Sequence, residues 1–569
     1  MQRSSQRIPV ARLVLGSLVL STLGVGCGGC EKKASEPPTV FLSKDAEMVL
    51  EIPDLGVVAK RKAALLQRFG ALVKPEQVKE LEQALTRAIG FDLTTAEGLT
   101  AAGLPASGAA AMEFVEQGRG ALWVVPVADA EKMTKVLADV VKARMTVDET
   151  KDEALAAPLS GQLTTYLRAF GDQKIPIAAV SIQKARGYAL IGAGSKAPDI
   201  VRAALGRKKE ESLASNADYA SLSKVADGGF VKLLVPSAQA VMGKLAGGQP
   251  STQGFAKEIM STAWWLALDE ASIALEARVR LSEAGKAQAA SFFKTGAKAP
   301  GGVLGTLGPE ATLIAYGAGD AKTVLDLLAP EGSELRLRLD GSFARAKDEL
   351  GVDVMTQLLP LSSGHGALAM GFNEFKQLPP LPEFLQAPAR YLWTVASVGL
   401  KSEADAKKLF DDKSGFDAVA ERRGLALEKR KAGAVDVTTM KLKDAPDGFD
   451  PVIAELLTHQ GAWITTNAGK QTDRVVAAKP VDDALPNGGL LVELRVRPLL
   501  ATLKALDLSG FQGAAEVMML RTFQARAVEL LEPFQRVAVR VQPASGDLAA
   551  TLRVEFAPAG AAPASPSSK

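Results

Sequence analysis

An internal repeat limits what this chain can fold into more than any other feature of its sequence. Five short segments recur in unbroken order at offsets of 258 to 274 residues, a pattern that chance matches would not produce. The matched pairs are 90–93 with 351–354, 111–114 with 369–372, 122–123 with 392–393, 199–201 with 473–475, and 228–231 with 488–491. Two copies of one domain are therefore expected, over residues 40–300 and 301–556.

Hydrophobic periodicity separates strands from helices in the first copy. Residues 120–127 form a short apolar run that is typical of a strand. Asp129 follows as a helix N-cap, and apolar residues then recur at helical spacing from 133 to 141. Pro75 and Gly90 mark the start and the end of an earlier predicted helix.

The second copy repeats this order. A strand is predicted over residues 390–398, and Ser402 begins the helix after it, with Asp405 at the third helical position. Each copy closes with two alternating runs that predict a hairpin. The runs are 266–269 with 273–281, and 536–542 with 548–556. The predicted fold class is α+β, as two tandem repeats, each a mostly antiparallel sheet covered by helices on one face.

Three landmarks within the copies resemble a known family. They are Gly-Phe-Asp at 90–92, the strand at 188–192 that leads to a helix containing Asp199, and Asn-Ala-Asp-Tyr at 216–219 shortly before Gly-Gly-Phe at 228–230. Their order resembles the bacterial family catalogued as domain of unknown function 3352, which is found in exported and membrane-attached proteins. The resemblance covers most of both copies and implies no catalytic residue. The second copy departs from the pattern at 465–467, where the first has Gly192-Ala193-Gly194.

The first 26 residues have the organisation of an export signal. Arg3, Arg7 and Arg12 precede an apolar run of 13 residues, Leu13–Val25. A membrane-spanning helix needs about 20 apolar residues, so the run is too short to span. Residues 1–26 are therefore predicted to be a lipoprotein signal peptide.

Cys27 follows this signal and is the predicted lipidation site, with Cys30 as the alternative if processing is atypical. Residues 27–39 are polar and contain proline, so they are expected to form a flexible tether. Residues 557–569 have little to bury and are expected to be disordered. Since Gly28 is not the aspartate that favours retention in the inner membrane, we expect an outer-membrane location in the bacterial cell envelope.

The basic surplus of the chain belongs entirely to the signal. The full chain has 67 basic and 64 acidic residues, and residues 1–26 contain three arginines and no acid. The numbers of basic and acidic residues are therefore equal from Cys27 onward. Net charge gives no reason to expect a nucleic-acid partner.

Groups that carry chemistry are few. The chain has two cysteines and two histidines, and both cysteines lie in the first 30 residues, so neither a disulfide scaffold nor a closed zinc site is expected in the folded body. Ser363 and His365 lie close together, but we expect them to point to opposite faces of a strand and not to relay a proton. His459 is interpreted as a helix-end residue before Gly461.

Two further segments have a chemical and a structural interpretation. Residues 192–197, Gly-Ala-Gly-Ser-Lys-Ala, fit a dinucleotide-binding pattern after a predicted strand. We interpret them as a tight strand-to-helix turn, because the matching turn of the second copy lacks the glycines. The acidic loop of Asp444, Asp447, Gly448 and Asp450 is interpreted as a turn, with calcium as the alternative, since its spacing is not that of an EF-hand. No cofactor and no metal are expected.

Aromatic and basic residues are likewise interpreted as structural. The five tryptophans are assigned to core packing, with an apolar or sugar pocket as the alternative. They are Trp123, Trp264, Trp265, Trp393 and Trp463. The densest basic patch, residues 422–431, is expected to be a solvated surface rather than a contact for anionic headgroups.

These observations together favour a lipid-anchored envelope protein with a binding, scaffolding or assembly role and no catalytic activity. The expected partners are a membrane, through the acyl anchor, and an envelope protein or an apolar ligand. The alternative is a carrier of a hydrophobic ligand such as lipid in the periplasm. A hydrolase that uses Ser363 and His365 is a third, weaker hypothesis.

Overall fold

A computed structural model of the chain defines the fold for most of the two predicted copies. The structure describes residues 36–57, 95–115, 120–238, 257–269, 271–293, 299–329, 331–350, 353–372, 392–411, 420–444, 452–467, 469–505 and 513–557, with a few single positions between these ranges. Cys27 and the helix predicted after Pro75 lie outside the described residues, apart from isolated positions of that helix.

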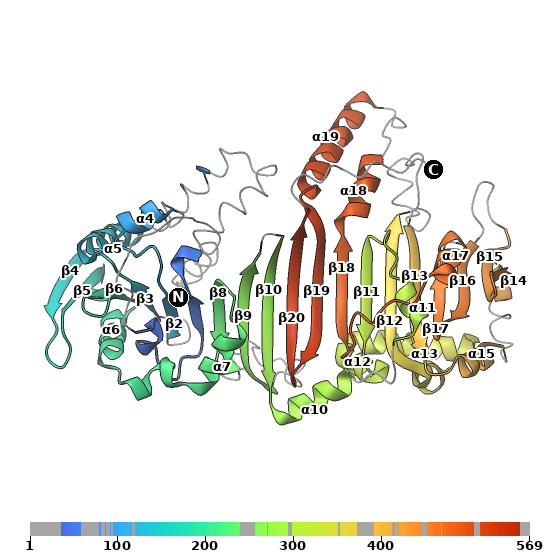
Figure 1. The fold of residues 1–569 in the computed structure, drawn as a ribbon, viewed down its shortest axis with the longest axis horizontal. Coiled ribbons are helices and arrows are strands. Elements are labelled where there is room, and N and C mark those ends of the chain that lie inside the picture. The colour runs from blue at the N-terminus through green and yellow to red at the C-terminus, as the bar shows by residue number, and fades with distance from the viewer. Residues whose placement is uncertain are drawn as a thin grey trace. The chain divides into compact units, whose positions relative to one another are not determined.

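The fold is mixed α/β, with extensive antiparallel sheet, and it divides into two compact units. Unit 1 ends at Arg280 and unit 2 begins at Leu281. Each unit is built around its own series of paired strands (Figure 1). The sequence predicts the boundary at 300/301, whereas the described residues from 281 to 293 already belong to unit 2.

The strands of unit 1 pair as antiparallel neighbours in an order that differs from their order in the chain. From one side to the other the order is β4 (Glu149–Ala154), β5 (Gln162–Phe170), β6 (Gln173–Gln183), β7 (Tyr188–Ala193), β3 (Gly120–Pro126), β2 (Ala110–Val115), β1 (Val49–Ile52), β8 (Val231–Val235), β9 (Ile259–Leu268) and β10 (Ser272–Leu281). The chain thus returns to the middle of the sheet after β7 and continues from β8.

Helices cover both faces of the unit 1 sheet. They are α4 (Ala96–Ala101), α5 (Ala130–Arg144), α6 (Ala197–Gly206) and α7 (Ala217–Val225), with short 3₁₀ turns at Pro38–Val40, Lys209–Glu211 and Leu213–Ser215. On β7, Leu190 packs in one apolar cluster with Val201 of α6, whereas its neighbour Ala189 packs in another with Met133 of α5. Successive strand residues point to opposite faces. The prediction of helices on one face is therefore wrong for unit 1, where the second face is buried as well.

The strands of unit 2 also pair as antiparallel neighbours. The order is β14 (Leu425–Ala432), β15 (Val435–Leu442), β16 (Val452–His459), β17 (Ala462–Thr466), β13 (Leu392–Leu400), β12 (Ser362–Phe372), β11 (Leu313–Ala318), β18 (Gly489–Arg495), β19 (Phe534–Ala544) and β20 (Asp547–Phe556). If the ten strands of each unit are numbered in the order in which they occur along the chain, both units have the same order of pairing.

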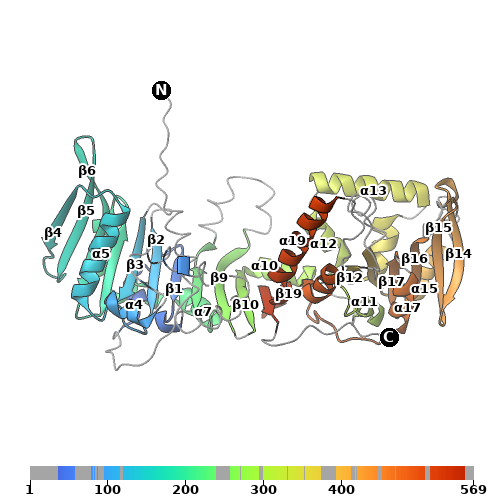
Figure 2. The ribbon, with the colours of Figure 1, turned by 90° about the horizontal axis from the view of Figure 1, so that it is seen from above.

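The helices of unit 2 lie on two sides of its sheet. They are α10 (Glu283–Phe292), α11 (Gly301–Gly305), α12 (Ala321–Leu328), α13 (Glu334–Leu350), α15 (Glu403–Asp411), α17 (Gly469–Ala477), α18 (Val496–Ala505) and α19 (Ala514–Leu531), with a π-helical turn at Val354–Leu358 and a 3₁₀ turn at Leu359–Leu361. Figure 2 shows α13 on the opposite side of unit 2 from α11 and α17. Val303 of α11 and Val475 of α17 pack with Tyr316 and Trp393 in the main core of the unit.

Local sequence signals predicted several elements correctly. The strand expected at 120–127 is β3, and Asp129 caps α5 by accepting hydrogen bonds from the amides of Glu131 and Lys132. Ser402 caps α15 through a 3.2 Å hydrogen bond from the Asp405 amide. Both predicted hairpins form, as β9 with β10 and β19 with β20. Patterning and capping are therefore sufficient to locate these elements without knowledge of tertiary contacts.

Candidate functional site

An apolar sheet face in unit 2 is the most prominent candidate site among the described residues. Residues that lie directly opposite each other in antiparallel strands share a face. The register pairs Leu490, Val492 and Leu494 of β18 with three valines of β19, and these with three apolar residues of β20. On the other side, the same β18 residues pair with β11, which continues to β12 and β13. We call this surface the apolar face; its members are Leu313, Ala315, Gly317, Gly366, Leu368, Met370, Thr394, Ala396, Val398, Leu490, Val492, Leu494, Val537, Val539, Val541, Ala550, Leu552 and Val554.

The apolar face stays substantially open to solvent. Leu490 is 46% exposed, Leu552 is 41% exposed and Val539 is 40% exposed. None of the members carries a charge, and Thr394 is the one member with a polar side chain. Because contiguous exposed apolar surface is uncommon on a soluble domain, it marks a place where another apolar surface binds.

The other side of the β19–β20 hairpin is polar, whereas the other side of β11, β12 and β13 forms the main core of the unit. Arg536 of β19 forms two hydrogen bonds of 2.6 Å with Glu555 of β20 and a 3.3 Å ion pair with Glu493 of β18. The hairpin of β19 and β20 therefore turns its charged residues to one side and its valines to the other. Alternation alone produces this separation, since side chains repeat every two residues along a strand.

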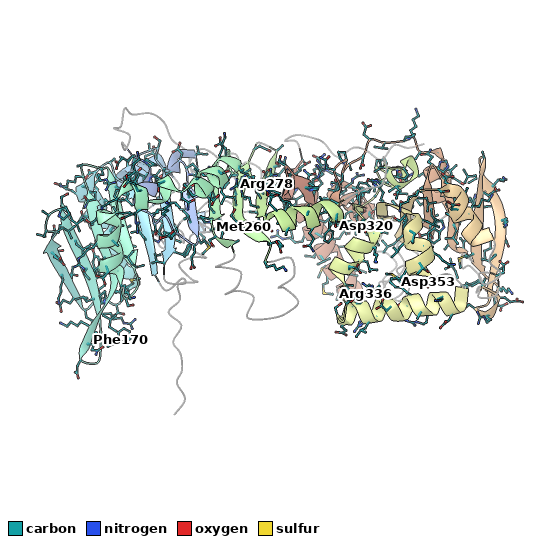
Figure 3. All side chains as sticks on the ribbon, turned by 90° about the horizontal axis from the view of Figure 1, so that it is seen from below. Phe170, Met260, Arg278, Asp320, Arg336 and Asp353 are labelled. Carbon is teal, nitrogen blue, oxygen red and sulfur yellow. The ribbon has the colours of Figure 1, made fainter. Side chains whose placement is uncertain are left out.

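An exposed apolar residue elsewhere in the chain, Phe170, stands alone on the surface. Phe170 is 48% exposed at the tip of the β5–β6 hairpin (Figure 3), and the guanidinium of Arg168 lies 5.0 Å from its ring. Single exposed aromatic residues of this kind are normal on protein surfaces. The apolar face differs because its members are contiguous over six neighbouring strands.

A shallow depression of about 600 Å³ also lies in unit 2. Its lining residues are Ala290, Phe293, Asn487, Gln542, Pro543, Ala544 and Ser545. The lining contains no charged, histidine or cysteine side chain, so it offers no ionisable acid or base and no carboxylate, imidazole or thiolate ligand for a metal.

The two residues that suggested a hydrolase lie in the core of unit 2. Ser363 and His365 are both 2% exposed. A Cβ atom added to Gly399 of the neighbouring strand would lie 2.3 Å from Ser363 Oγ and 3.2 Å from His365 Cβ. Both side chains thus lie over Gly399, and the expectation that they point to opposite faces is wrong. They are two residues apart, and a spacing of two returns to the same face.

His365 belongs to a buried polar network. The Tyr316 hydroxyl lies 3.0 Å from His365 Nδ1 and donates a 2.7 Å hydrogen bond to Asp483 Oδ1. Burial, the hydrogen bond to Asp483 and its negative charge all raise the pKa of Tyr316. Since Tyr316 is completely buried, its hydroxyl holds the loop at Asp483 against the sheet and has no contact with solvent.

His459 and the glycine-rich segment have structural explanations. His459 is the last residue of β16 and not a helix end, so that prediction is wrong; Gln460 and Gly461 both have positive φ and form the turn to β17. Two such residues in succession are typical of a tight hairpin turn. The segment at 192–197 forms the predicted strand-to-helix turn between β7 and α6. A Cβ atom on Gly192 would lie 2.5 Å from the Ala197 carbonyl oxygen, which explains the glycine.

The acidic loop lies mostly outside the described residues, which include Asp444 but not Asp447, Gly448 or Asp450. Within the described part of the chain, no group of three or more histidine, cysteine, aspartate or glutamate residues is placed to hold a metal ion. The same part of the chain contains no helix that is long and apolar enough to cross a membrane.

The tryptophans divide between core and surface. Trp393 is 2% exposed and Trp265 is 8% exposed, as core packing predicts, and Trp123 and Trp463 are partly buried. Trp264 is 39% exposed, and its indole nitrogen donates a 3.2 Å hydrogen bond to Thr262. The core interpretation is therefore confirmed for two of the five and does not hold for Trp264.

One residue of the predicted basic patch, Arg430, binds a buried acid. Its guanidinium donates hydrogen bonds of 2.7 and 2.8 Å to the two carboxylate oxygens of Glu455. Thr439 and Thr472 also donate to this carboxylate. Burial alone would raise the pKa of Glu455, but these hydrogen bonds and the charge of Arg430 together lower it. Arg430 thus stabilises the β15–β16 side of unit 2.

Replacing Glu455 with glutamine is expected to lower the free energy of unfolding of unit 2 by about 2–3 kcal/mol at neutral pH, because the partly buried pair loses one charge. The pKa of Glu455 is lower in the folded state than its ordinary value of 4.5. Its stabilisation is therefore complete above that value and is lost as the pH falls through the folded pKa. Thermal unfolding measured between neutral and acidic pH checks this.

Glu455→Gln should lose less stability than the parent protein on acidification. Equal losses would contradict a stabilising role for the charged Glu455 carboxylate. Glu428→Gln is the matched control. Glu428 pairs with Lys441, and its side chain is 55% exposed. A surface pair contributes less than about 1 kcal/mol, so this control should change little.

Comparisons with known proteins give little further information. No family model matches the chain, and no curated protein matches it. Crystal form III of TP0453 is similar at a TM-score of 0.24 and 11% identity, over 44% of this chain and 82% of that chain. Crystal form I of TP0453 is similar at a TM-score of 0.23 and 11% identity, over 44% of this chain and 81% of that chain. Similarity at this level does not establish a common fold.

Proposed function

We propose that this chain is a lipid-anchored lipoprotein of the bacterial cell envelope with a non-catalytic binding role. The anchor is inferred from the sequence, with residues 1–26 as the signal and Cys27 as the acylated residue. The outer membrane is the proposed location. The binding role is supported by one observation, the apolar face of unit 2, whose leucines and valines remain accessible in the folded chain.

An envelope protein with a complementary apolar surface is the proposed occupant of this face. The buried centre of a protein interface is apolar and poor in charged residues, and the rows of leucine and valine on β18, β19 and β20 have this composition. The second candidate is a hydrophobic ligand such as lipid, for which the chain would act as a carrier. The absence of charged members favours it, because an acyl chain needs no polar partner.

We also propose that the two units are tandem copies of one α+β domain. The five sequence matches and the common order of strand pairing support this. If the copies share an origin, the apolar face of unit 2 is a specialisation of a common sheet.

A photo-cross-linking residue at Val539 tests the binding role in cells. Arg540 is the matched control, because it is the next residue of β19, is also exposed, and points to the opposite face. Discrete adducts from position 539 and none from position 540 are expected. Equal labelling at the two positions, or none at either, would contradict the proposal. The mass of the adduct distinguishes a protein partner from a lipid ligand.

A further inference from the structure

The first described residues of the chain are packed into unit 1. We call residues 36–48 the N-terminal strap. Phe41 and Leu42 of the strap are completely buried, and both belong to the apolar cluster that also contains β7 and α6 residues. The strap backbone is bonded to the unit as well, since the Leu213 amide donates a 2.8 Å hydrogen bond to the Leu42 carbonyl. The strap is therefore part of the folded unit.

The start of the strap is fixed to the turn between β6 and β7. Arg186, in this turn, donates hydrogen bonds of 2.7 and 3.1 Å to the Glu36 carboxylate. The same guanidinium lies 3.9 Å from the centre of the Phe41 ring. The Tyr188 hydroxyl donates a 2.8 Å hydrogen bond to the Glu36 carbonyl. The last residues of the predicted tether, 36–39, are therefore held by unit 1, and the described contacts of the chain begin at Glu36, beside one end of β6.

The position of Glu36 limits the distance between unit 1 and the proposed acylated residue. Cys27 and Glu36 are nine residues apart. A fully extended chain spans at most about 3.3–3.6 Å per residue, so the two positions lie no more than about 32 Å apart. β6 has 11 residues and is itself about 33 Å long. The tip of the β5–β6 hairpin, at Phe170, lies beyond the other end of β6 (Figure 3) and is therefore about as far from Glu36 as the tether can reach.

We propose that the β6–β7 end of unit 1 faces the membrane and that the tip of the β5–β6 hairpin faces away from it. The inference rests on the proposed function, because it needs the acyl anchor at Cys27. The strap decides the matter. If residues 36–48 were free, a tether of 22 residues would reach about 75 Å, enough for any side of unit 1 to face the membrane. Since Phe41 and Leu42 are buried, the strap cannot lengthen the tether while unit 1 is folded.

The test uses the lipidated full chain with Cys30→Ser, reconstituted in phospholipid vesicles that carry an energy-transfer acceptor on a fraction of the headgroups. A fluorescent donor is attached at Lys184→Cys or, as the matched control, at Asp172→Cys. Both positions are exposed, and they lie in the turns at the two ends of β6. Higher transfer is expected from position 184 than from position 172. Equal transfer at the two positions, or higher transfer from position 172, would overturn the inference.

A longer tether provides the second measurement. About 30 glycine and serine residues inserted between positions 30 and 31 have a root-mean-square length of about 30 Å, which is comparable with the length of β6. The insertion is expected to lower transfer from position 184 and to reduce its difference from position 172. A difference that the insertion leaves unchanged would mean that the tether does not orient unit 1, and would overturn the inference. Failure of the proposed anchor would appear separately, as a chain that takes up no fatty-acid label and does not float with the vesicles.

Discussion

Replacing Cys27 with serine is expected to release the protein from membranes that have been washed at high salt. An acyl chain contributes about 0.8 kcal/mol for each buried CH₂ group, so an anchor of several chains holds a protein almost irreversibly. Serine has no thiol to acylate. Fractionation of cells that express the variant, together with metabolic labelling by a fatty-acid probe, measures both consequences.

Cys30→Ser is the matched control for this experiment. The two cysteines are three residues apart, and the control should keep both the label and the membrane location. If the label and the membrane location are lost with Cys30→Ser but not with Cys27→Ser, the lipidation site is Cys30. Retention of Cys27→Ser on salt-washed membranes would contradict the anchor. The high-salt wash is needed because it removes proteins that are held on the membrane only by ionic contacts.

Replacing Trp393 with alanine is expected to lower the free energy of unfolding of unit 2 by about 3–5 kcal/mol, the usual loss for a large aromatic residue in a core. The indole lies across Gly371, where an added Cβ atom would be 2.5 Å from Cζ2. The Arg474 guanidinium lies 5.9 Å from the ring on the α17 side. Calorimetry of the purified protein checks this prediction.

Trp264→Ala is the control, because Trp264 is 39% exposed. Its loss should cost less than about 1 kcal/mol, as for most surface substitutions. Equal losses for the two variants would mean that Trp393 does not pack as the structure describes. A loss of partner binding with unchanged stability in Trp393→Ala would instead restore the alternative interpretation of a ligand pocket.

Features that depend on neighbouring residues were predictable from the sequence. Asp129 and Ser402 are polar residues before apolar helical patterns, and each caps a helix. The runs at 536–542 and 548–556 alternate in polarity and form a hairpin. In each case the signal and the structure lie within a few residues, so distant contacts do not decide the outcome.

Features that depend on distant segments were not predictable in the same way. Alternation shows that β18 and β19 each have an apolar side, but it does not show whether another element covers that side. His459 precedes a glycine with positive φ, and such a glycine ends a helix as readily as it forms a hairpin turn. The pairing of Glu455 with Arg430 joins residues 25 apart, and neither position carries a local signal of its partner.

The position of α18 and α19 in the chain has a consequence for how this protein can change. Both helices lie between β18 and β19, yet these strands pair directly from Leu490–Arg495 to Arg536–Val541. Their register is set by this pairing and by the neighbours β11 and β20. The helical segment thus lies at a hairpin connection. Its first helix, α18, buries Val496 and Leu500, whereas the described side chains of α19 are exposed or half-buried, so α19 can diverge with little effect on the sheet. A protein built on this sheet could therefore lengthen, shorten or resurface α19 as one separable element.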